Sequence, residues 1–162
     1  MEEIYKEYSK IVYNYLLSLT CNSELAEELM QETFYSAVKN INKFRNDSSI
    51  KTWLCKIAKN KWIDYIKKSN ISNELSIDDI EEKFLLVNSF EEEYSSKEAV
   101  IDLYKKIHSL DEKTREVIYL RIRADLSFKD IGLIMGETEN WARVTFYRAK
   151  VKLKEEFDNE KK

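Results

Sequence analysis

Hydrophobic residues recur every three or four positions along most of the chain, which is the spacing of residues on one face of an α-helix. In the first part of the chain this pattern predicts three helices, over residues 4–19, about 22–41 and about 50–68. A polar stretch over residues 42–49 separates the last two. Three helices of this length can bury a common core, so we expect this part to fold as a helical bundle.

A second set of helices is indicated by residues that cap helix starts. Ser followed three residues later by an acidic residue is typical of a helix N-terminus, and the chain has this pattern at Ser95, Ser109 and Ser127. Gly136 suits the left-handed backbone that ends many helices, and Thr138 is then the expected N-cap of a last helix. The second part is therefore expected to be helical as well.

Between these two sets, residues 69–94 lose the helical spacing and accumulate Asn, Ser and acidic residues. Such a composition is typical of a linker. The sequence therefore predicts an all-α protein with two small helical domains, residues 1–68 and 95–162, joined by an acidic linker over residues 69–94.

The composition excludes several classes of site. The chain has no proline and only two glycines, Gly132 and Gly136, and neither lies in a glycine-rich phosphate loop. One histidine, His108, and two cysteines, Cys21 and Cys55, leave little material for a metal cluster or for a nucleophile with its base. We expect a protein without metal, cofactor or catalytic activity, whose two cysteines are reduced and buried.

The start of the chain and its hydropathy bear on its location. The first residues form an acidic amphipathic stretch instead of a cationic segment followed by an apolar one. No run approaches the roughly 20 apolar residues of a membrane span. We therefore expect a cytoplasmic protein without direct membrane insertion.

The net charge of −3 hides a strong segregation of charge along the chain. Residues 39–68 carry nine Lys or Arg against two acids, and residues 143–154 carry five Lys or Arg and no acid. Residues 1–38 and 69–99 are acidic. One basic run is most often a solvated helix face, but two runs on two helical units favour a polyanion bound at two places.

Residues 127–154 have the pattern of a helix-turn-helix unit, a short helix ending at Gly136, a tight turn and a long basic helix. Arg can read guanine in the major groove and Lys can hold phosphate. Many helical hairpins with a basic second helix are only core elements, so this pattern alone leaves DNA binding open. The apolar positions expected at the crossing are Ile131, Ile134, Ala142 and Phe146, and the long helix offers Arg143, Tyr147, Arg148 and Lys150.

Several segments carry a family resemblance when they are taken together. In the first domain they are residues 26–34 (AEELMQETF) and 52–60 (TWLCKIAKN) with Asp64 and Lys68, and in the second they are residues 110–121 (LDEKTREVIYLR), 125–131 (DLSFKDI) and 147–150 (YRAK). In order and spacing they resemble bacterial sigma factors of the extracytoplasmic-function (ECF) group, whose small members keep only the domains called region 2 and region 4. The resemblance spans nearly the whole chain.

The resemblance implies a function and partners. Such a protein binds core RNA polymerase, recognises the −35 element of promoter DNA with region 4, and melts and reads the −10 element with region 2. It is not itself an enzyme. Members are usually held inactive by an anti-sigma factor, commonly a membrane-tethered one, so such a partner is expected here.

The resemblance also implies roles for individual residues. The positions that match the family's polymerase-binding segment are Glu28, Leu29 and Gln31. Asn60 matches the position that helps capture a flipped −10 base, and its surroundings supply Lys56, Lys59 and Lys61 for phosphate, Trp62 for stacking, and Asp64 of the same motif. The −35 positions are Arg143, Val144, Tyr147 and Arg148, with Lys150 beside them.

The sequence departs from the family pattern at some of these positions. Glu28 stands where Asp is usual, which keeps the charge and changes the docking geometry. Val144 and Thr145 replace a common Ser-Arg pair, which removes one cation from the last helix. The −35 sequence that this chain reads is therefore expected to be unusual.

Two functions of other classes stay open at this point. A stand-alone helix-turn-helix regulator would bind specific duplex DNA without polymerase, with the first domain as a dimerisation or effector module. A helical adaptor would bind proteins only, and the basic runs would be incidental. Charge reversal at Arg143 and Arg148 separates the adaptor, which would keep its activity, from both DNA-binding functions.

Overall fold

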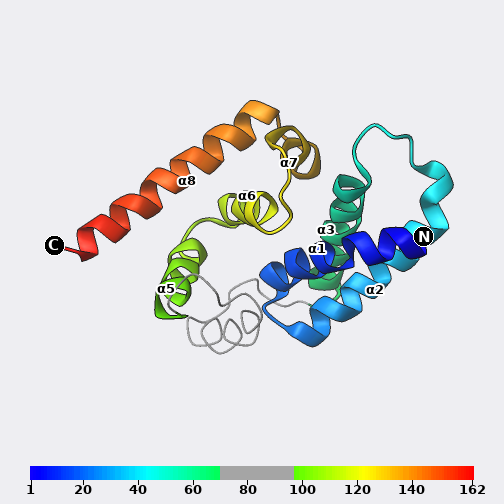
Figure 1. Cartoon of the computed structure of the whole chain (residues 1–162), viewed down its shortest axis with the longest axis horizontal. Coiled ribbons are helices and arrows are strands. Elements are labelled where there is room, and N and C mark those ends of the chain that lie inside the picture. The colour runs from blue at the N-terminus through cyan, green and yellow to red at the C-terminus, as the bar shows by residue number, and fades with distance from the viewer. Residues whose placement is uncertain (70–96) are drawn as a thin grey trace.

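The computed structural model describes residues 1–69 and 97–162. Within these ranges the chain forms seven α-helices and one short 3₁₀-helix and has no β-strand, so the all-α prediction is confirmed. The helices gather into an N-terminal unit (α1 to α3) and a C-terminal unit (α5 to α8), which lie side by side in Figure 1. No helix among the described residues is both long and apolar enough to cross a membrane.

The N-terminal unit is a bundle of three helices that pack on one another. They are α1 (Glu2–Thr20), α2 (Ser23–Asn40) and α3 (Ile50–Ser69), with the 3₁₀-helix η1 (Ile41–Lys43) after α2. The Asn22 side chain accepts a hydrogen bond from the Leu25 backbone N–H, which caps the start of α2 as predicted. Cys21 adopts a left-handed backbone, φ 48°, and ends α1 where the sequence indicated.

The C-terminal unit comprises α5 (Lys97–His108), α6 (Glu112–Ile122), α7 (Phe128–Met135) and α8 (Glu139–Glu160). Ser127 and Thr138 cap α7 and α8 through their hydroxyls, as predicted. The prediction that Ser109 caps the next helix is wrong. Asp111 caps α6 by accepting from the Thr114 N–H, while the Ser109 hydroxyl donates to the carbonyl of the preceding helix. The predicted cap Ser95 lies outside the described residues.

Helices α7 and α8 form the helix-turn-helix crossing. A Cβ placed on Gly132 would lie 2.8 Å from the Glu137 carbonyl oxygen and 2.9 Å from the Thr138 backbone, so glycine is what lets the turn fold back onto α7. Gly136 ends α7 at φ 68°, in the left-handed region that glycine adopts without strain. The predicted apolar positions Ile131 and Ala142 are fully buried at the crossing.

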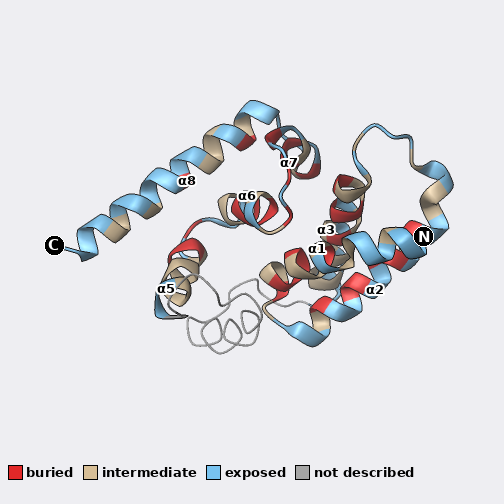
Figure 2. Ribbon diagram, in the orientation of Figure 1, coloured by how far each residue is buried: buried red, intermediate tan, exposed pale blue. Residues whose placement is uncertain are grey.

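The hydrophobic core does not stop at the boundary between the two units. One cluster of buried side chains includes Val12 and Leu54 of the N-terminal unit and Leu120, Leu126 and Ile131 of the C-terminal unit. Helix α1 packs on α6, and α3 packs on α7. Figure 2 shows the buried residues concentrated on the faces where these helices meet. The two units therefore share a core in this structure.

The two cysteines lie in different surroundings. They are not joined by a disulfide, and Cys55 is fully buried beside Leu54 in the core. Cys21 is only partly buried, so the expectation of burial is wrong for this residue. Its position at the end of α1 places it at the rim of the N-terminal bundle.

The turn geometry predicts that two glycine substitutions destabilise the fold for different reasons. Gly132→Ala is expected to lower the free energy of unfolding by about 1–3 kcal/mol because the new methyl meets backbone. Gly136→Ala meets open space and should cost about 1 kcal/mol through its backbone conformation alone. Urea titration measures both. A neutral or stabilised Gly132→Ala, as helix propensity alone favours, would contradict the close crossing.

The cysteine environments predict unequal reactivity. Burial raises the pKa of the Cys55 thiol from 9.0 to about 12, so at pH 8 it carries almost no thiolate, the form that alkylates. Iodoacetamide at pH 8 should modify Cys21 first and Cys55 only in urea, with sites assigned by peptide mass spectrometry. A Cys21→Ser variant isolates the rate at Cys55, and rapid labelling of that variant in the native state would contradict the prediction.

Candidate nucleic-acid interface

Helix α3 divides the residues predicted for the −10 element between two faces. Lys56, Asn60 and Asp64 are exposed, and their spacing of four residues places them in one row along the helix. Lys61 is partly exposed. This row offers a cation, an amide and a carboxylate to solvent on rigid backbone. Of the residues predicted to bind the −10 element, those in this row are the exposed ones in this structure.

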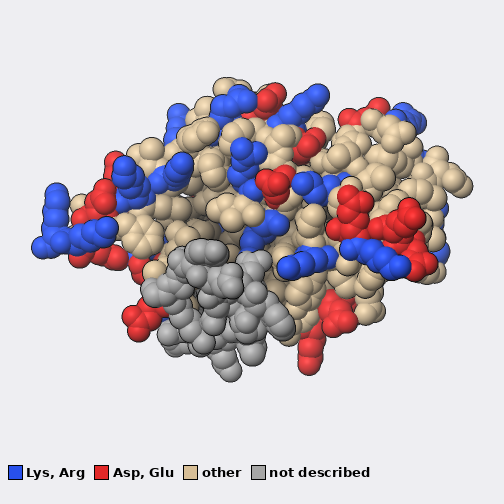
Figure 3. Space-filling view, in the orientation of Figure 1, with Lys and Arg blue, Asp and Glu red and all other residues tan. Residues whose placement is uncertain are grey.

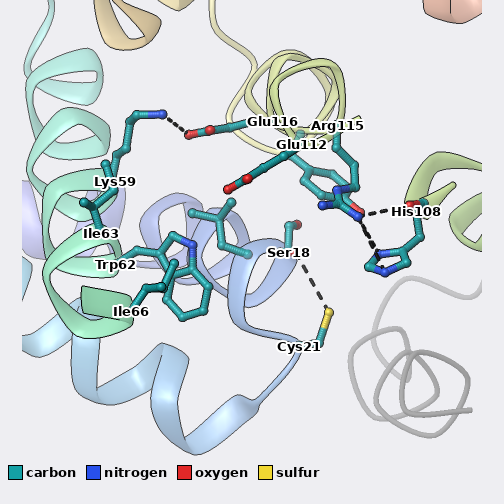
Figure 4. A pocket seen from close by; sticks show the side chains of 12 residues that line it. Ser18, Cys21, Lys59, Trp62, Ile63, Ile66, His108, Glu112, Arg115 and Glu116 are labelled. Atoms are coloured by element: carbon teal, nitrogen blue, oxygen red, sulfur yellow. Dashed lines mark hydrogen bonds and ion pairs between the residues drawn. The ribbon is translucent and has the colours of Figure 1, made fainter. Parts of the chain in front are cut away.

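Lys59 and Trp62 lie on a different face of α3 and point toward the C-terminal unit. Lys59 Nζ donates to Glu116 Oε1 of α6 at 2.7 Å, and Figure 4 shows this ion pair spanning the gap between the helices. The exposed fractions of the two side chains are 17% and 10%. Trp62 stacks on Tyr65 with ring centroids 5.9 Å apart. The structure thus turns two predicted DNA contacts inward.

Glu116 contacts both neighbouring helices of the N-terminal unit, and the sequence analysis gave it no role. Its Oε1 also accepts a hydrogen bond, 2.7 Å long, from the hydroxyl of Tyr15 on α1, which is fully buried. Burial, and then the neighbouring carboxylate, raise the pKa of Tyr15 well above its usual value, so the phenol stays protonated and donates. The carboxylate therefore joins α6 to both α1 and α3.

A cavity of about 110 Å³ lies between the two units, next to this ion pair. Its apolar wall includes Trp62, Ile63 and Ile66 of α3. On the opposite side Arg115 donates to the His108 carbonyl oxygen at 3.0 Å. The lone histidine is thus held in the C-terminal unit and faces the apolar side of α3 across the cavity.

Helix α8 gathers four of the residues predicted for the −35 element. Arg143, Val144, Tyr147 and Arg148 line one open groove on the helix surface, together with Val151. Lys150 is exposed on the same helix but does not line that groove. In Figure 3, Lys and Arg side chains follow α8 along its length. This arrangement presents cations around an apolar strip, which suits contact with base edges and flanking phosphates.

The first turn of α8 holds Arg143 in place before any ligand binds. Glu139 accepts from the Arg143 guanidinium at 2.9 Å, and the guanidinium lies 5.5 Å from the centre of the Phe128 ring. The Tyr147 ring is 5.9 Å from the same phenyl ring. Phe128, at the start of α7, therefore contacts two of the groove residues of α8, and the sequence analysis gave it no such role.

The residues predicted to bind polymerase do not all lie on the surface of α2. Glu28 and Gln31 are exposed, but Leu29 is 2% exposed and packs in the core. Leu29 therefore lies beneath the surface of α2 in this structure, because its position on the helix faces α1 and α3. Tyr35 and Val38 are 64% and 50% exposed on α2 and extend the exposed surface with apolar area that the sequence analysis did not assign.

The chain is similar in sequence to known sigma factors. Residues 4–70 match the family described as Sigma-70 region 2. The chain is similar to the ECF RNA polymerase sigma factor SigM of Bacillus subtilis, with 32% identity over 154 residues that cover 95% of this chain and 93% of SigM. It is also similar to the RNA polymerase sigma factor YlaC of Bacillus subtilis, with 29% identity over 155 residues, 95% of this chain and 90% of YlaC.

Two solved structures have a similar fold. The sigma factor RpoE, solved in complex with the anti-sigma factor NepR from Bartonella quintana, matches with a TM-score of 0.70 and 21% identity over 95% of this chain and 94% of its own. CnrH, solved with the cytosolic domain of CnrY, matches with a TM-score of 0.68 and 18% identity over 98% of this chain and 87% of its own. The likeness of fold extends over both helical units.

The burial along α2 predicts different outcomes for neighbouring substitutions. Leu29→Ala should lower the free energy of unfolding by about 2–5 kcal/mol, because it removes buried side-chain volume from the core. Gln31→Ala, two positions away and exposed, should change it by no more than about 0.5 kcal/mol. Urea titration followed by circular dichroism checks both. A stable Leu29→Ala variant would mean that Leu29 is not a core residue.

Proposed function

The chain belongs to the ECF family of RNA polymerase sigma factors and directs transcription initiation, and we propose that α2, α3 and α8 are its surfaces for polymerase, the −10 element and the −35 element. The single observation that carries this assignment is the groove on α8. Arg143, Val144, Tyr147 and Arg148, which the family resemblance selects, line that one groove. On this proposal residues 1–68 act as region 2 and residues 95–162 as region 4.

The −35 element is read by the first half of α8. The N-terminal part of a recognition helix enters the major groove, and here that part carries Arg143 with Val144 and Tyr147. Arg143 is held by Glu139 and rests over Phe128, so little side-chain freedom is lost when it contacts a guanine. Arg148 and Lys150 hold the flanking phosphates. Val144 contacts a thymine methyl or a similar apolar edge.

The −10 element is bound along α3. Asn60 offers an amide that can donate to and accept from the edge of an unstacked base. Lys56 and Lys61 are the cations nearest to it on accessible faces of the helix, and they attract the phosphates of the single strand. Asp64, one turn further along the row, limits how closely the strand approaches there. Lys59 and Trp62 join this surface only when the C-terminal unit moves away.

Core polymerase docks on α2. Glu28 and Gln31 give this surface its charge and hydrogen bonds, and Tyr35 and Val38 give it exposed apolar area. Lys39 Nζ lies 4.5 Å from the centre of the Tyr35 ring, which keeps that ring in place. An apolar anchor rimmed by polar groups is the usual composition of a protein interface.

The remaining partners follow from the family. RpoE was solved with an anti-sigma factor, and we propose that this chain also has an anti-sigma partner that covers its polymerase and DNA surfaces. The chemistry of RNA synthesis belongs to the polymerase, so the chain itself contributes binding energy and no catalytic group. Its place of action is the cytoplasm, where polymerase and chromosome meet.

Reconstituted transcription tests the proposal. Purified chain and sigma-free core polymerase are incubated with a library of genomic fragments, and start sites are mapped by sequencing. A shared two-part motif is expected upstream of the starts. Arg143→Ala should reduce discrimination at one part of the −35 motif by about 5- to 150-fold, whereas Arg148→Ala removes a phosphate contact and should weaken initiation at all promoters alike. Asn60→Ala should reduce initiation at all promoters.

A matched control is Lys161→Ala, which removes a cation at the far end of the same helix α8 and should leave the motif and the yield unchanged. If Arg143→Ala keeps the motif and Arg148→Ala keeps the yield, α8 is not the −35 reader. If no start sites appear with several cores while the chain alone retains specific duplex DNA, it acts as a stand-alone regulator.

A further inference from the structure

The two helical units are held together by polar contacts as well as by their shared core. Glu116 accepts from Lys59 and from Tyr15, each at 2.7 Å. At the start of α3, Lys51 Nζ donates to the Asp125 carbonyl oxygen at 2.9 Å. A carboxylate with an exposed fraction of 10% is stable only because both donors reach it. The ion pair is thus a specific feature of the closed arrangement.

The closed arrangement does not fit simultaneous binding to both promoter elements. By their names the −35 and −10 elements lie about 25 base pairs apart, which is about 85 Å on duplex DNA at 3.4 Å per base pair. A compact chain of 162 residues has a radius of gyration of about 15 Å. The 27 residues between Ser69 and Lys97 reach at most about 90 Å. The units must therefore separate before both elements are engaged.

Glu116 occupies the position on Lys59 that a DNA phosphate would take. Both are anionic oxygens that accept from the ammonium group at close range. While Glu116 holds Lys59 and the C-terminal unit lies over the Trp62 face of α3, the Lys56, Asn60 and Asp64 row and the partly exposed Lys61 remain open to a strand. Closure thus removes one cation and one aromatic ring from the DNA surface.

We propose that the Lys59–Glu116 ion pair, supported by Tyr15, is a latch that keeps the chain closed and withholds part of its −10 surface until the C-terminal unit moves away. Opening exchanges the Glu116 carboxylate for a phosphate on the same ammonium group. The effect on promoter binding rests on the proposed function, whereas the closure itself is a property of the free chain.

Small-angle X-ray scattering of the full chain tests the closure. Glu116→Lys and Lys59→Glu each place like charges in contact, so both variants should show a larger radius of gyration than the wild type. The double variant Lys59→Glu with Glu116→Lys restores an ion pair of reversed polarity and should return to the wild-type radius. Lys6→Glu is the control, because it breaks a pair of 2.8 Å that joins two turns of one helix.

The latch is overturned if both single variants keep the wild-type radius with unchanged helicity, or if the double variant stays as open as the single ones. If the charge reversals reduce helicity, the Glu116→Gln variant tests the latch in their place, since it removes the charge but keeps the side-chain size and an acceptor. The readout is the binding of the Glu116→Gln variant to a single-stranded oligonucleotide at several salt concentrations. The plot of log binding constant against log salt concentration should be steeper than that of the wild type by about 0.7, because the released Lys59 adds one phosphate contact. An unchanged slope overturns the latch.

These outcomes separate the two proposals. A chain that initiates transcription but does not expand in the single variants retains its proposed function and has no latch. A chain that expands and recloses as expected but initiates no transcription with core polymerase has the latch and lacks the proposed function.

Discussion

The arrangement of the two helical units depends on one carboxylate. Glu116 lies at the boundary between them and is nearly buried, so its charge must be matched there. Lys59 from α3 supplies the cation and Tyr15 from α1 supplies a second donor. Because the donors come from two different helices, the pairing fixes the position of α6 against both. In other proteins, removing one partner from a buried pair of this kind costs about 3–5 kcal/mol.

The shared core explains why the closed form is stable and why the proposed opening would need a partner. Each unit has fewer than 80 described residues, a size at which a separate core buries a small fraction of the chain's surface. Packing Leu120 and Leu126 into the same cluster as Val12 and Leu54 increases that fraction. The proposed separation of the units would expose this area again, and contacts with polymerase, DNA or both would have to offset its free-energy cost.

The geometry of α8, the proposed recognition helix, is set largely by its own unit. Thr138 caps α8, Gly132 permits the close turn, and Phe128 supports Arg143 and Tyr147. None of these contacts involves the N-terminal unit. The groove on α8 should therefore keep its geometry if the units separate, whereas the proposed −10 surface on α3 would change, because the contact that covers Lys59 would be lost.

The sequence by itself determined the helices, their order and most of their ends, because these depend on hydrogen bonds and backbone angles within a few residues. Asn22, Ser127, Thr138 and Gly136 act where their types indicate. Ser109 does not, since Asp111 competes for the same helix start and is the stronger acceptor. The candidate DNA residues of α8 were also found from sequence, because an exposed helix face needs no distant partner.

Only the tertiary structure decided which side of each helix faces protein. Leu29 was predicted to contact polymerase and Lys59 to hold phosphate, yet in this structure one lies in the core and the other pairs with a residue 57 positions away. In α3, apolar and basic residues occur on several faces, so helical spacing alone leaves the orientation of Lys59 undetermined. The packing of α6 against α1 and α3 fixes it, since burying Glu116 without a cation would cost more free energy than the contact yields.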